Sequence, residues 1–133
     1  AALAGELGYP QEPAVMRERI RSIASDQDRS LALACIGDEA GGEEIVGWLA
    51  LEFRESVLSG AVAEIAGLVV GASARRCGAG RALVAWAEAE ARRRGIATLQ
   101  LRSNAQRVEA AVFYPALGFE MTKLSRTFVK RLT

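Results

Sequence analysis

The stretch Glu64–Gly80, with the sequence EIAGLVVGASARRCGAG, predicts a strand that runs into a glycine-containing loop and then into a helix. A helix start presents unpaired backbone N–H groups and the positive end of the helix dipole, and glycines let the backbone close around an anion. A phosphate-bearing ligand is therefore expected here. Arg75, Gly78 and Gly80 match neither the dinucleotide-binding fingerprint, which needs a third glycine, nor the nucleotide-triphosphate loop, which ends in Gly-Lys-Ser/Thr.

The elements around this stretch alternate without a linker or a repeat. Hydrophobic spacing and turn residues predict, in chain order, a helix over 12–25, strands over 31–35 and 45–53, a loop over 54–60, a strand over 61–70, a helix over 79–94 that ends at Gly95, a strand over 98–102, a helix over 107–114 and a strand over 119–129. Strand, helix and strand around the glycine loop imply one parallel pair in a hairpin-rich sheet. We expect an α/β (α+β) fold in which a mixed, mostly antiparallel sheet is flanked by helices, in a single domain over residues 1–133.

The composition excludes several classes of protein. A chain of 133 residues that is 50% hydrophobic can bury one core and is not disordered, and a net charge of +1 argues against nucleic-acid and membrane partners. The sequence has no His, and Cys35 and Cys77 form no C-x-x-C pair, so zinc ribbons, other metal sites and His-based catalysis are not expected. With no apolar span and no signal-peptide pattern, the cytoplasm is the default location.

Three motifs follow one another along the chain: Arg75–Gly80 (RRCGAG), which comes after an apolar strand end, Ser103–Arg107 (SNAQR) and Phe113–Phe119 (FYPALGF). Together they resemble the Gcn5-related N-acetyltransferase (GNAT) superfamily. RRCGAG is similar to the family's Arg/Gln-x-x-Gly-x-Gly/Ala loop, and the other two motifs are similar to its closing signature. The resemblance implies the acyl-CoA N-acyltransferase fold and acetyl-CoA as co-substrate. Because members usually open with a strand before the first helix, we expect that first strand to be missing here.

The resemblance also implies how coenzyme A is held. Neighbouring strands would splay near Gly67, so that backbone groups of Leu68–Val70 pair with the pantetheine arm, while N–H groups of Cys77–Arg81 hold the pyrophosphate. The residues expected to bind the cofactor are Leu68, Val69, Val70, Arg75, Arg76, Cys77, Gly78, Ala79, Gly80, Arg81 and Asn104. The alternatives are an ordinary strand-to-helix turn for the loop, a packing role for Gly67, a helix cap for Asn104 and an inert loop position for Cys77.

Glu64 is the only charged residue of its strand. A lone carboxylate in an apolar strand must be hydrogen-bonded, paired with a cation, or poised to take up a proton. Glu64 precedes Arg75 by the same offset at which histone acetyltransferases resembling this superfamily carry their general base, so the resemblance implies that role. The alternative is a structural carboxylate paired with an arginine such as Arg102.

Tyr114 is the second catalytic candidate. The resemblance makes it the general acid that protonates the departing coenzyme A thiolate, whereas an aromatic residue in a helix is otherwise a core residue. Pro115 lacks an N–H and disfavours the α conformation of the residue before it, so a distorted helix end is expected at Tyr114.

The resemblance and these residues together predict an acetyl-CoA-dependent N-acetyltransferase in which a primary amine attacks the thioester directly in a ternary complex. A non-catalytic acyl-CoA-binding or sensory module and an unrelated nucleotide-binding fold are the alternatives. The acceptor is expected to be a small-molecule or peptide amine, and a homodimer is left open. Four acidic residues favour a cationic acceptor: Glu6, Glu12, Glu52 and Glu55.

Overall fold

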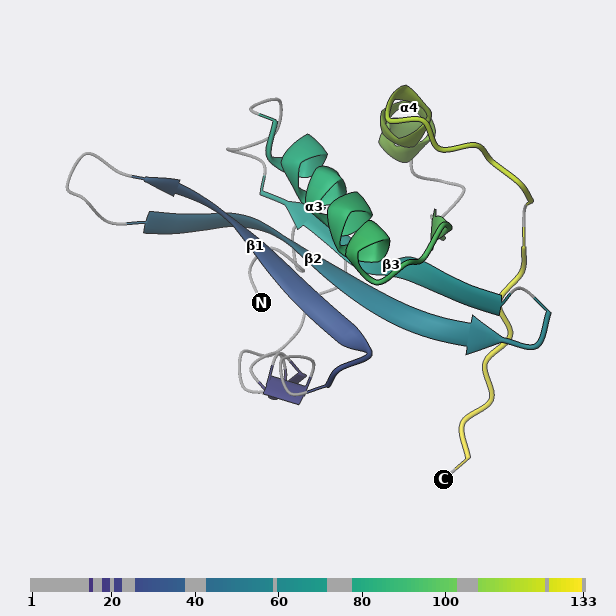
Figure 1. Ribbon diagram of the computed structural model, residues 1–133. Helices are drawn as coiled ribbons and strands as arrows, with labels where there is room; N and C mark the ends of the chain where they lie inside the picture. The colour runs from purple at the N-terminus through teal and green to yellow at the C-terminus, as the bar shows by residue number, and fades with distance from the viewer. Residues whose placement is uncertain are drawn as a thin grey trace. The chain divides into compact units, whose positions relative to one another are not determined.

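The chain forms two compact units, Ala1–Arg102 and Ser103–Thr133, and each is described by itself. The computed structural model describes residues 15, 18–19, 21–22, 26–37, 43–58, 60–71, 78–102, 108–123 and 125–132. The first unit contains a sheet and helix α3, and the second contains helix α4 (Figure 1). Val15, Glu18, Arg19, Arg21 and Ser22 are helical, as the helix expected over 12–25 requires.

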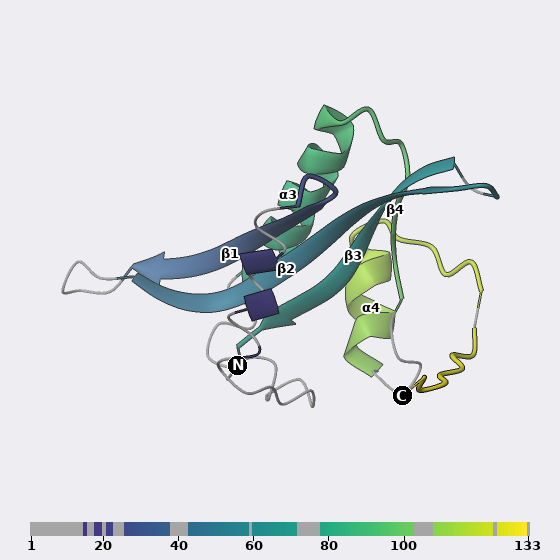
Figure 2. The ribbon, with the colours of Figure 1, turned by 90° about the horizontal axis from the view of Figure 1, so that it is seen from below.

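The sheet has four strands in the order β1-β2-β3-β4. They are β1 (Arg29–Gly37), β2 (Glu43–Ser56), β3 (Gly60–Val70) and β4 (Leu99–Leu101). β1 with β2 and β2 with β3 pair antiparallel, whereas β3 and β4 pair parallel (Figure 2). The expected mixed, mostly antiparallel sheet is therefore confirmed. The near-continuous apolar run of β3 is buried from Val62 to Ile65, as expected for a strand covered on both faces.

The β2–β3 hairpin is longer than the sequence predicted. The loop expected over 54–60 is wrong, because β2 continues to Ser56 and β3 begins at Gly60. Ser56 pairs with Gly60, which has φ +70°, and the fully exposed Val57 and Leu58 lie in the turn between them. Polar residues at 54–56 looked like a loop, but a hairpin open to water accepts polar side chains as long as its backbone groups pair.

A β-bulge and a tight contact surround Gly67. Gly67 pairs with Ala50 and Ile65 with Leu51, which leaves Ala66 as an extra residue on β3. A Cβ atom on Gly67 would lie 2.7 Å from Cζ3 of Trp48, so the indole ring packs directly on the glycine. This contact gives the packing interpretation of Gly67 a physical basis.

Helix α3 (Ala79–Arg93) packs on one face of the sheet (Figure 1). Its buried residues, at helical spacing, are Leu83, Val84, Ala87 and Ala91. Gly95, with φ +73°, ends the helix as predicted: its N–H donates to the carbonyl of Arg92 at 2.9 Å, and the N–H of Ile96 donates to that of Ala91 at 2.9 Å. This pair of bonds is a Schellman motif, which needs the left-handed conformation that glycine adopts without strain.

The outer face of α3 carries ion pairs around Glu90. Glu88 pairs with Arg92 and Glu90 with Arg94, one helical turn apart, each at 3.9 Å. Arg93 contacts Glu90 more closely, with Nε at 3.2 Å from Oε2, and this hydrogen bond lowers the pKa of the Glu90 carboxyl below its usual value. Exposed pairs of this kind contribute less than about 1 kcal/mol each, so the buried stripe fixes the helix.

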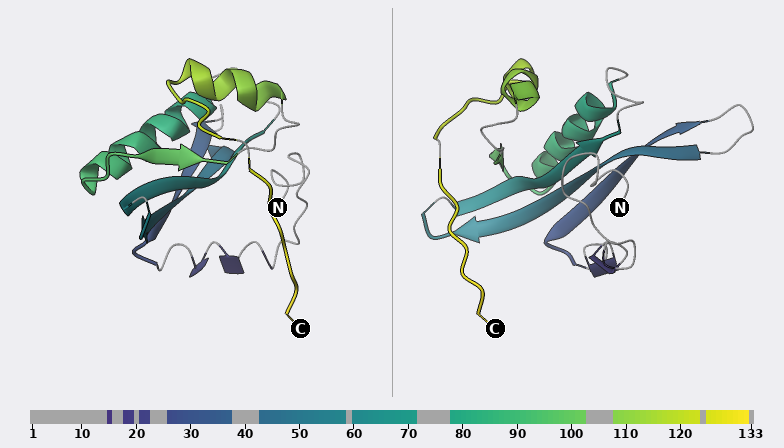
Figure 3. Two further views of the ribbon diagram at one scale, coloured as in Figure 1. Left: turned by 90° about the vertical axis from the view of Figure 1, so that its right-hand side faces the viewer. Right: turned by 180° about the vertical axis from the view of Figure 1, so that it is seen from behind.

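The second unit contains α4 (Val108–Ala116) and a coil that follows it (Figure 3). The strand expected over 119–129 is wrong, since residues 119–123 and 125–129 form neither helix nor strand. Met121, Phe128 and Val129 are largely exposed. Apolar residues favour a strand only where a neighbouring strand accepts its backbone hydrogen bonds, and the described part of this unit contains no such neighbour.

The Gly67–Trp48 contact yields a prediction about stability. Gly67→Ala should lower the free energy of unfolding by about 1–3 kcal/mol, because the added methyl group displaces a stiff ring. Urea unfolding of Gly67→Ala, Trp48→Leu and the double variant measures the coupling. In the Trp48→Leu background the same alanine should cost much less. Equal costs in both backgrounds would show that the ring does not require the glycine.

Candidate functional site

Glu64 is held by three polar groups of the neighbouring strands. Its side chain is 11% exposed, and its Oε2 lies 2.5 Å from Nη2 of Arg54 on β2. Its Oε1 accepts a hydrogen bond from Nε2 of Gln100 on β4 at 3.1 Å and lies 3.8 Å from Nε of Arg102. Among the described residues Glu64 is the only buried charged group.

Strand register brings these groups together. Glu64 pairs directly with Gln100 in the parallel β3–β4 ladder, and Arg54 pairs with Val62, two residues from Glu64 on the same face. Diagonal neighbours on one face of a sheet are within reach of a long side chain, so Arg54 extends to the carboxylate. Arg102 follows the last residue of β4 and lies two positions beyond Gln100.

The ion pairs are those expected if Glu64 is a structural carboxylate paired with arginine. A buried carboxylate loses several kcal/mol of hydration, and cations and hydrogen-bond donors must offset that cost. The expected pairing with Arg102 is present, but Arg54 makes the closer contact. The carboxylate therefore has a fixed orientation, which a structural residue and a general base both require.

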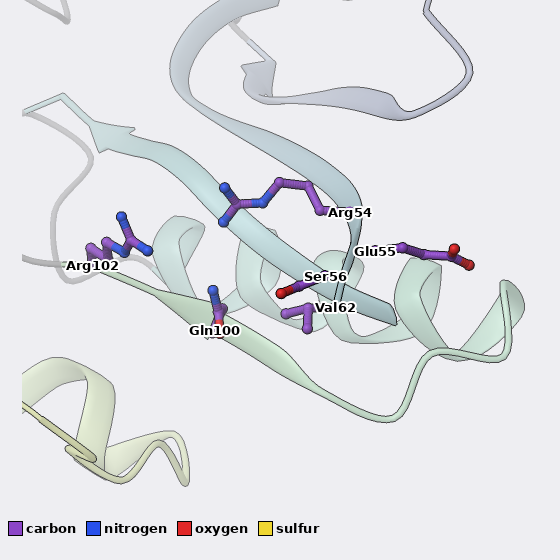
Figure 4. A pocket seen from close by; sticks show the side chains of 6 residues that line it. All are labelled: Arg54, Glu55, Ser56, Val62, Gln100 and Arg102. Atoms are coloured by element: carbon purple, nitrogen blue, oxygen red, sulfur yellow. The ribbon is translucent and has the colours of Figure 1, made fainter. Parts of the chain in front are cut away.

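The three residues that contact the Glu64 carboxylate, Arg54, Gln100 and Arg102, line an open pocket of about 310 Å³ (Figure 4). It is lined by Arg54, Glu55, Ser56, Val62, Gln100 and Arg102. The two arginines that form ion pairs with the Glu64 carboxylate are thus also part of the pocket wall. The side chain of Glu55 points away from these arginines in Figure 4.

The start of α3 has the features of an anion site. Gly78, with φ +83°, is the N-cap residue and makes no side-chain cap hydrogen bond. The first bond into the helix runs from the N–H of Ala82 to the carbonyl of Gly78 at 2.9 Å. The N–H groups of residues 79–81 precede that bond, and the first turn holds no acidic residue. A helix start at this glycine was predicted, and it is confirmed.

The carboxyl end of β3 extends beyond its parallel neighbour. The β3–β4 pairing ends at Ile65 and Leu101, whereas β3 continues to Val70. Leu68 and Val70 are half-buried and Val69 is buried. Because β3 and β4 are parallel, α3 returns antiparallel to them, and its N-terminus lies at the same end of the sheet as Leu68–Val70 (Figure 3).

Tyr114 lies within α4, and the helix end expected at this residue is wrong. The helix continues through Pro115 and ends at Ala116, and Gly118, with φ +93°, lies in the turn that follows. The N–H of Phe119 donates to the carbonyl of Tyr114 at 3.1 Å, and that of Gly118 donates to Pro115 at 3.0 Å. This Schellman motif satisfies the last carbonyls and offsets the preference of a residue before proline for extended backbone.

The aromatic neighbours of Tyr114 orient its ring. Phe113 and Phe119 contact it edge to face, with ring centroids 5.1 and 5.7 Å away. Phe119 is brought back to the ring by the turn at Gly118, as the hydrophobic contact of a Schellman motif requires. The FYPALGF run is thus one structural device that fixes a tyrosine.

The predicted site residues fall into three groups. In the first unit the structure places Glu64 and Leu68–Val70 on β3, and Gly78 with residues 79–81 at the start of α3. Tyr114 belongs to the second unit. The other predicted residues, Arg75, Arg76, Cys77 and Asn104, lie outside the described residues.

Sequence reasoning missed Arg54 and Gln100. Neither residue was recognised as a partner of Glu64, because the predicted strand ended at Phe53 and no strand register was predicted. A signal was present: Gly60 favours a tight turn, and a hairpin closed there pairs Arg54 with Val62, beside Glu64.

Comparison with known proteins identifies the family. The sequence model of the acetyltransferase (GNAT) family matches residues 3–119. The chain belongs to this GNAT family. A search of curated proteins finds no match. The described residues hold no group of three or more Cys, Asp or Glu side chains arranged to bind a metal ion, and no described helix is long and apolar enough to cross a membrane.

Solved GNAT structures share the fold. A transcriptional regulator from Bacillus halodurans C-125 is 31% identical, with a TM-score of 0.82 over 96% of this chain and 88% of that one. AAC(6')-Iy in complex with the bisubstrate analog CoA-S-monomethyl-acetylneamine is 18% identical, with a TM-score of 0.83 over 98% and 88%. Glucosamine-6-phosphate N-acetyltransferase from Arabidopsis thaliana is 20% identical, with a TM-score of 0.78 over 96% and 86%.

Proposed function

We propose that this GNAT protein transfers the acetyl group of acetyl-CoA to a primary amine. The observation that carries the proposal is the junction of β3 and α3. There a strand end extends beyond its parallel neighbour, next to a helix N-terminus that opens with a left-handed glycine. A backbone edge suits the amide groups of a pantetheine arm, and the helix start suits a pyrophosphate.

The residues proposed to bind coenzyme A are those expected from the sequence. Backbone groups of Leu68–Val70 pair with the pantetheine arm, and N–H groups at Gly78–Arg81 bind the pyrophosphate. Arg75, Arg76, Cys77 and Asn104 complete the set as predictions. The absence of an acidic residue in the first turn of α3 supports an anionic guest, because a carboxylate there would compete for the same donors.

The proposed reaction needs few side chains. The neutral amine attacks the thioester carbonyl carbon, so that an N–C bond forms and the C–S bond breaks. The amine proton moves toward Glu64, directly or through water, and Tyr114 gives its proton to the departing thiolate. Holding both substrates in one cleft supplies much of the rate. The low exposure of the Glu64 side chain, 11%, favours transfer through a water.

The two units are proposed to act as one GNAT domain. The family match over residues 3–119 runs across the boundary at Ser103, which supports a single domain containing Glu64 and Tyr114. The alternative is an acyl-CoA sensory module that binds the same ligand without transfer, and the similarity to a transcriptional regulator from Bacillus halodurans is the observation that favours it. A homodimer and a cytoplasmic location stay predictions.

Gly78→Val should weaken coenzyme A binding by at least about tenfold, or about 1.4 kcal/mol. A β-branched residue resists φ +83°, and its bulk lies where the pyrophosphate would bind. Isothermal titration calorimetry measures the dissociation constant. The matched control is Gly95→Val, which imposes the same backbone strain at the other end of α3, with φ +73° and equally open space around the new Cβ. Equal affinities for the two variants would contradict the assignment.

Glu64→Gln should lower kcat by about a hundredfold or more, the usual contribution of a general base. The loss should be largest near about pH 6 and shrink toward about pH 10, where an aliphatic amine is increasingly neutral without help. Rates across this range test the role with saturating acetyl-CoA and an amine acceptor. Glu88→Gln, which removes a carboxylate of α3 that pairs with Arg92, should leave the profile unchanged. A uniform loss at every pH would assign Glu64 a structural role.

Tyr114→Phe should lower kcat by about tenfold to a thousandfold with little change in the acetyl-CoA KM, because only the proton donor is lost. The phenylalanine ring keeps the edge-to-face contacts with Phe113 and Phe119, so stability should change little. Tyr114→Leu serves as the comparison, since it removes the ring as well. If Tyr114→Phe turns over like the wild type while Tyr114→Leu is unstable, the tyrosine is a packing residue.

A further inference from the structure

The pocket beside Glu64 contains two guanidinium groups that face its carboxylate, those of Arg54 and Arg102. Glu55 also lines the pocket but points away from both arginines in Figure 4, and Glu52 lies opposite Glu64 in the β2–β3 ladder. Nε of Arg102 lies 3.8 Å from that carboxylate, which is beyond hydrogen-bond distance, and its side chain is 74% exposed. In the part of the chain that the structure describes, Glu64 is the one ion-pair partner of Arg102. Most donors of this guanidinium are therefore available to a ligand.

The other walls of the pocket suit a small anion. Nε2 of Gln100 donates to Glu64, and Oγ of Ser56 accepts the N–H of Leu58 at 3.2 Å, which leaves the serine O–H as a donor. Val62 forms an apolar wall. A volume of about 310 Å³ accepts one small group, and guanidinium donors match the oxygens of carboxylate and phosphate.

The pocket lies next to the proposed reaction centre. Val62 lines it, Glu64 follows two residues along β3, and Leu68–Val70 lie further in the same direction. At about 3.3 Å per residue, Val62 and Glu64 are about 7 Å apart along the strand. A group held by the two arginines is therefore a few bonds away from an amine at Glu64.

We propose that Arg54 and Arg102 form a subsite for an anionic group, a carboxylate or a phosphate, on the molecule whose amine is acetylated. The inference rests on the proposed function and names the acceptor class: an amine with a nearby anion, such as an amino acid or an amino sugar phosphate. It replaces the purely cationic acceptor that Glu52 and Glu55 suggested. Arg102 is the specificity residue, whereas Arg54 has a second task in holding Glu64.

Anion binding is tested without any reaction. The Arg Nε–Hε signals in NMR spectra of the coenzyme A-saturated protein are followed while inorganic phosphate or malonate is added, since coenzyme A occupies the start of α3. A saturable shift of the Arg54 and Arg102 signals is expected, and Arg102→Gln should abolish the Arg54 response. Arg92→Gln is the control, because Arg92 is an exposed arginine of α3, 76% exposed. No saturable response to either anion in the wild type overturns the subsite.

Acceptor preference is tested with matched pairs. Serine is compared with serinamide, and glucosamine-6-phosphate with glucosamine, so that the members of a pair differ in the anionic group. For at least one pair kcat/KM should favour the anionic member by about tenfold or more, and Arg102→Gln should remove this preference while Arg92→Gln keeps it. Partial recovery in Arg102→Lys would support a charge-based role.

The two proposals fail in different ways. Transfer to neutral and anionic members at equal rates overturns the subsite and supports the proposed function. Saturable anion binding at Arg102 without transfer to any amine supports an anion site and overturns the proposed function. A preference that survives in Arg102→Gln also overturns the subsite.

Discussion

The burial of one carboxylate in the middle of β3 constrains the rest of the site. Glu64 lies in a run of buried apolar residues, and its charge is tolerated because two neighbouring strands supply compensating groups. Arg54 can do so only if β2 extends past Phe53, and Gln100 only if β4 pairs in parallel register with β3. The length of the hairpin and the position of β4 are therefore coupled to a single charge.

Because β4 is short, the carboxyl end of β3 extends beyond its pairing with β4. Three residues suffice to place Gln100 against Glu64, and β3 then continues to Val70 beyond the end of this pairing. The bulge at Ala66 falls where β3 passes the end of β4, and bulges increase twist and redirect a strand. The part of β3 that pairs with β4 thus holds the Glu64 carboxylate, and the part beyond this pairing is proposed to bind coenzyme A.

Local sequence signals were sufficient to predict the elements whose structure depends on interactions within a few residues. The buried stripe of α3 and its end at Gly95 were predictable, because helical spacing and a left-handed glycine act within a few residues. The start of α3 at Gly78 was also predictable from the glycines. Of the partners of Glu64, Arg102 was predicted, but Arg54 and Gln100 were not, since Arg54 depends on hairpin register and Gln100 on a parallel pairing 36 residues away. The prediction of a strand over 119–129 was wrong for a related reason. Apolar residues favour a strand, but a strand forms only where a neighbouring strand pairs with its backbone.

Glycine position also explains why Tyr114 is well oriented despite Pro115. The proline removes one helix donor and disfavours the α conformation of Tyr114, yet Gly118 closes a Schellman motif whose bonds end on residues 114 and 115. The same turn returns Phe119 to the tyrosine ring. A backbone turn thus orients an aromatic ring in the second unit, as strand register positions a carboxylate in the first. In both cases one side chain is positioned by residues elsewhere in the sequence. Arg102 differs, because its long contact with Glu64 leaves most of its donors available to the anionic group of the proposed acceptor.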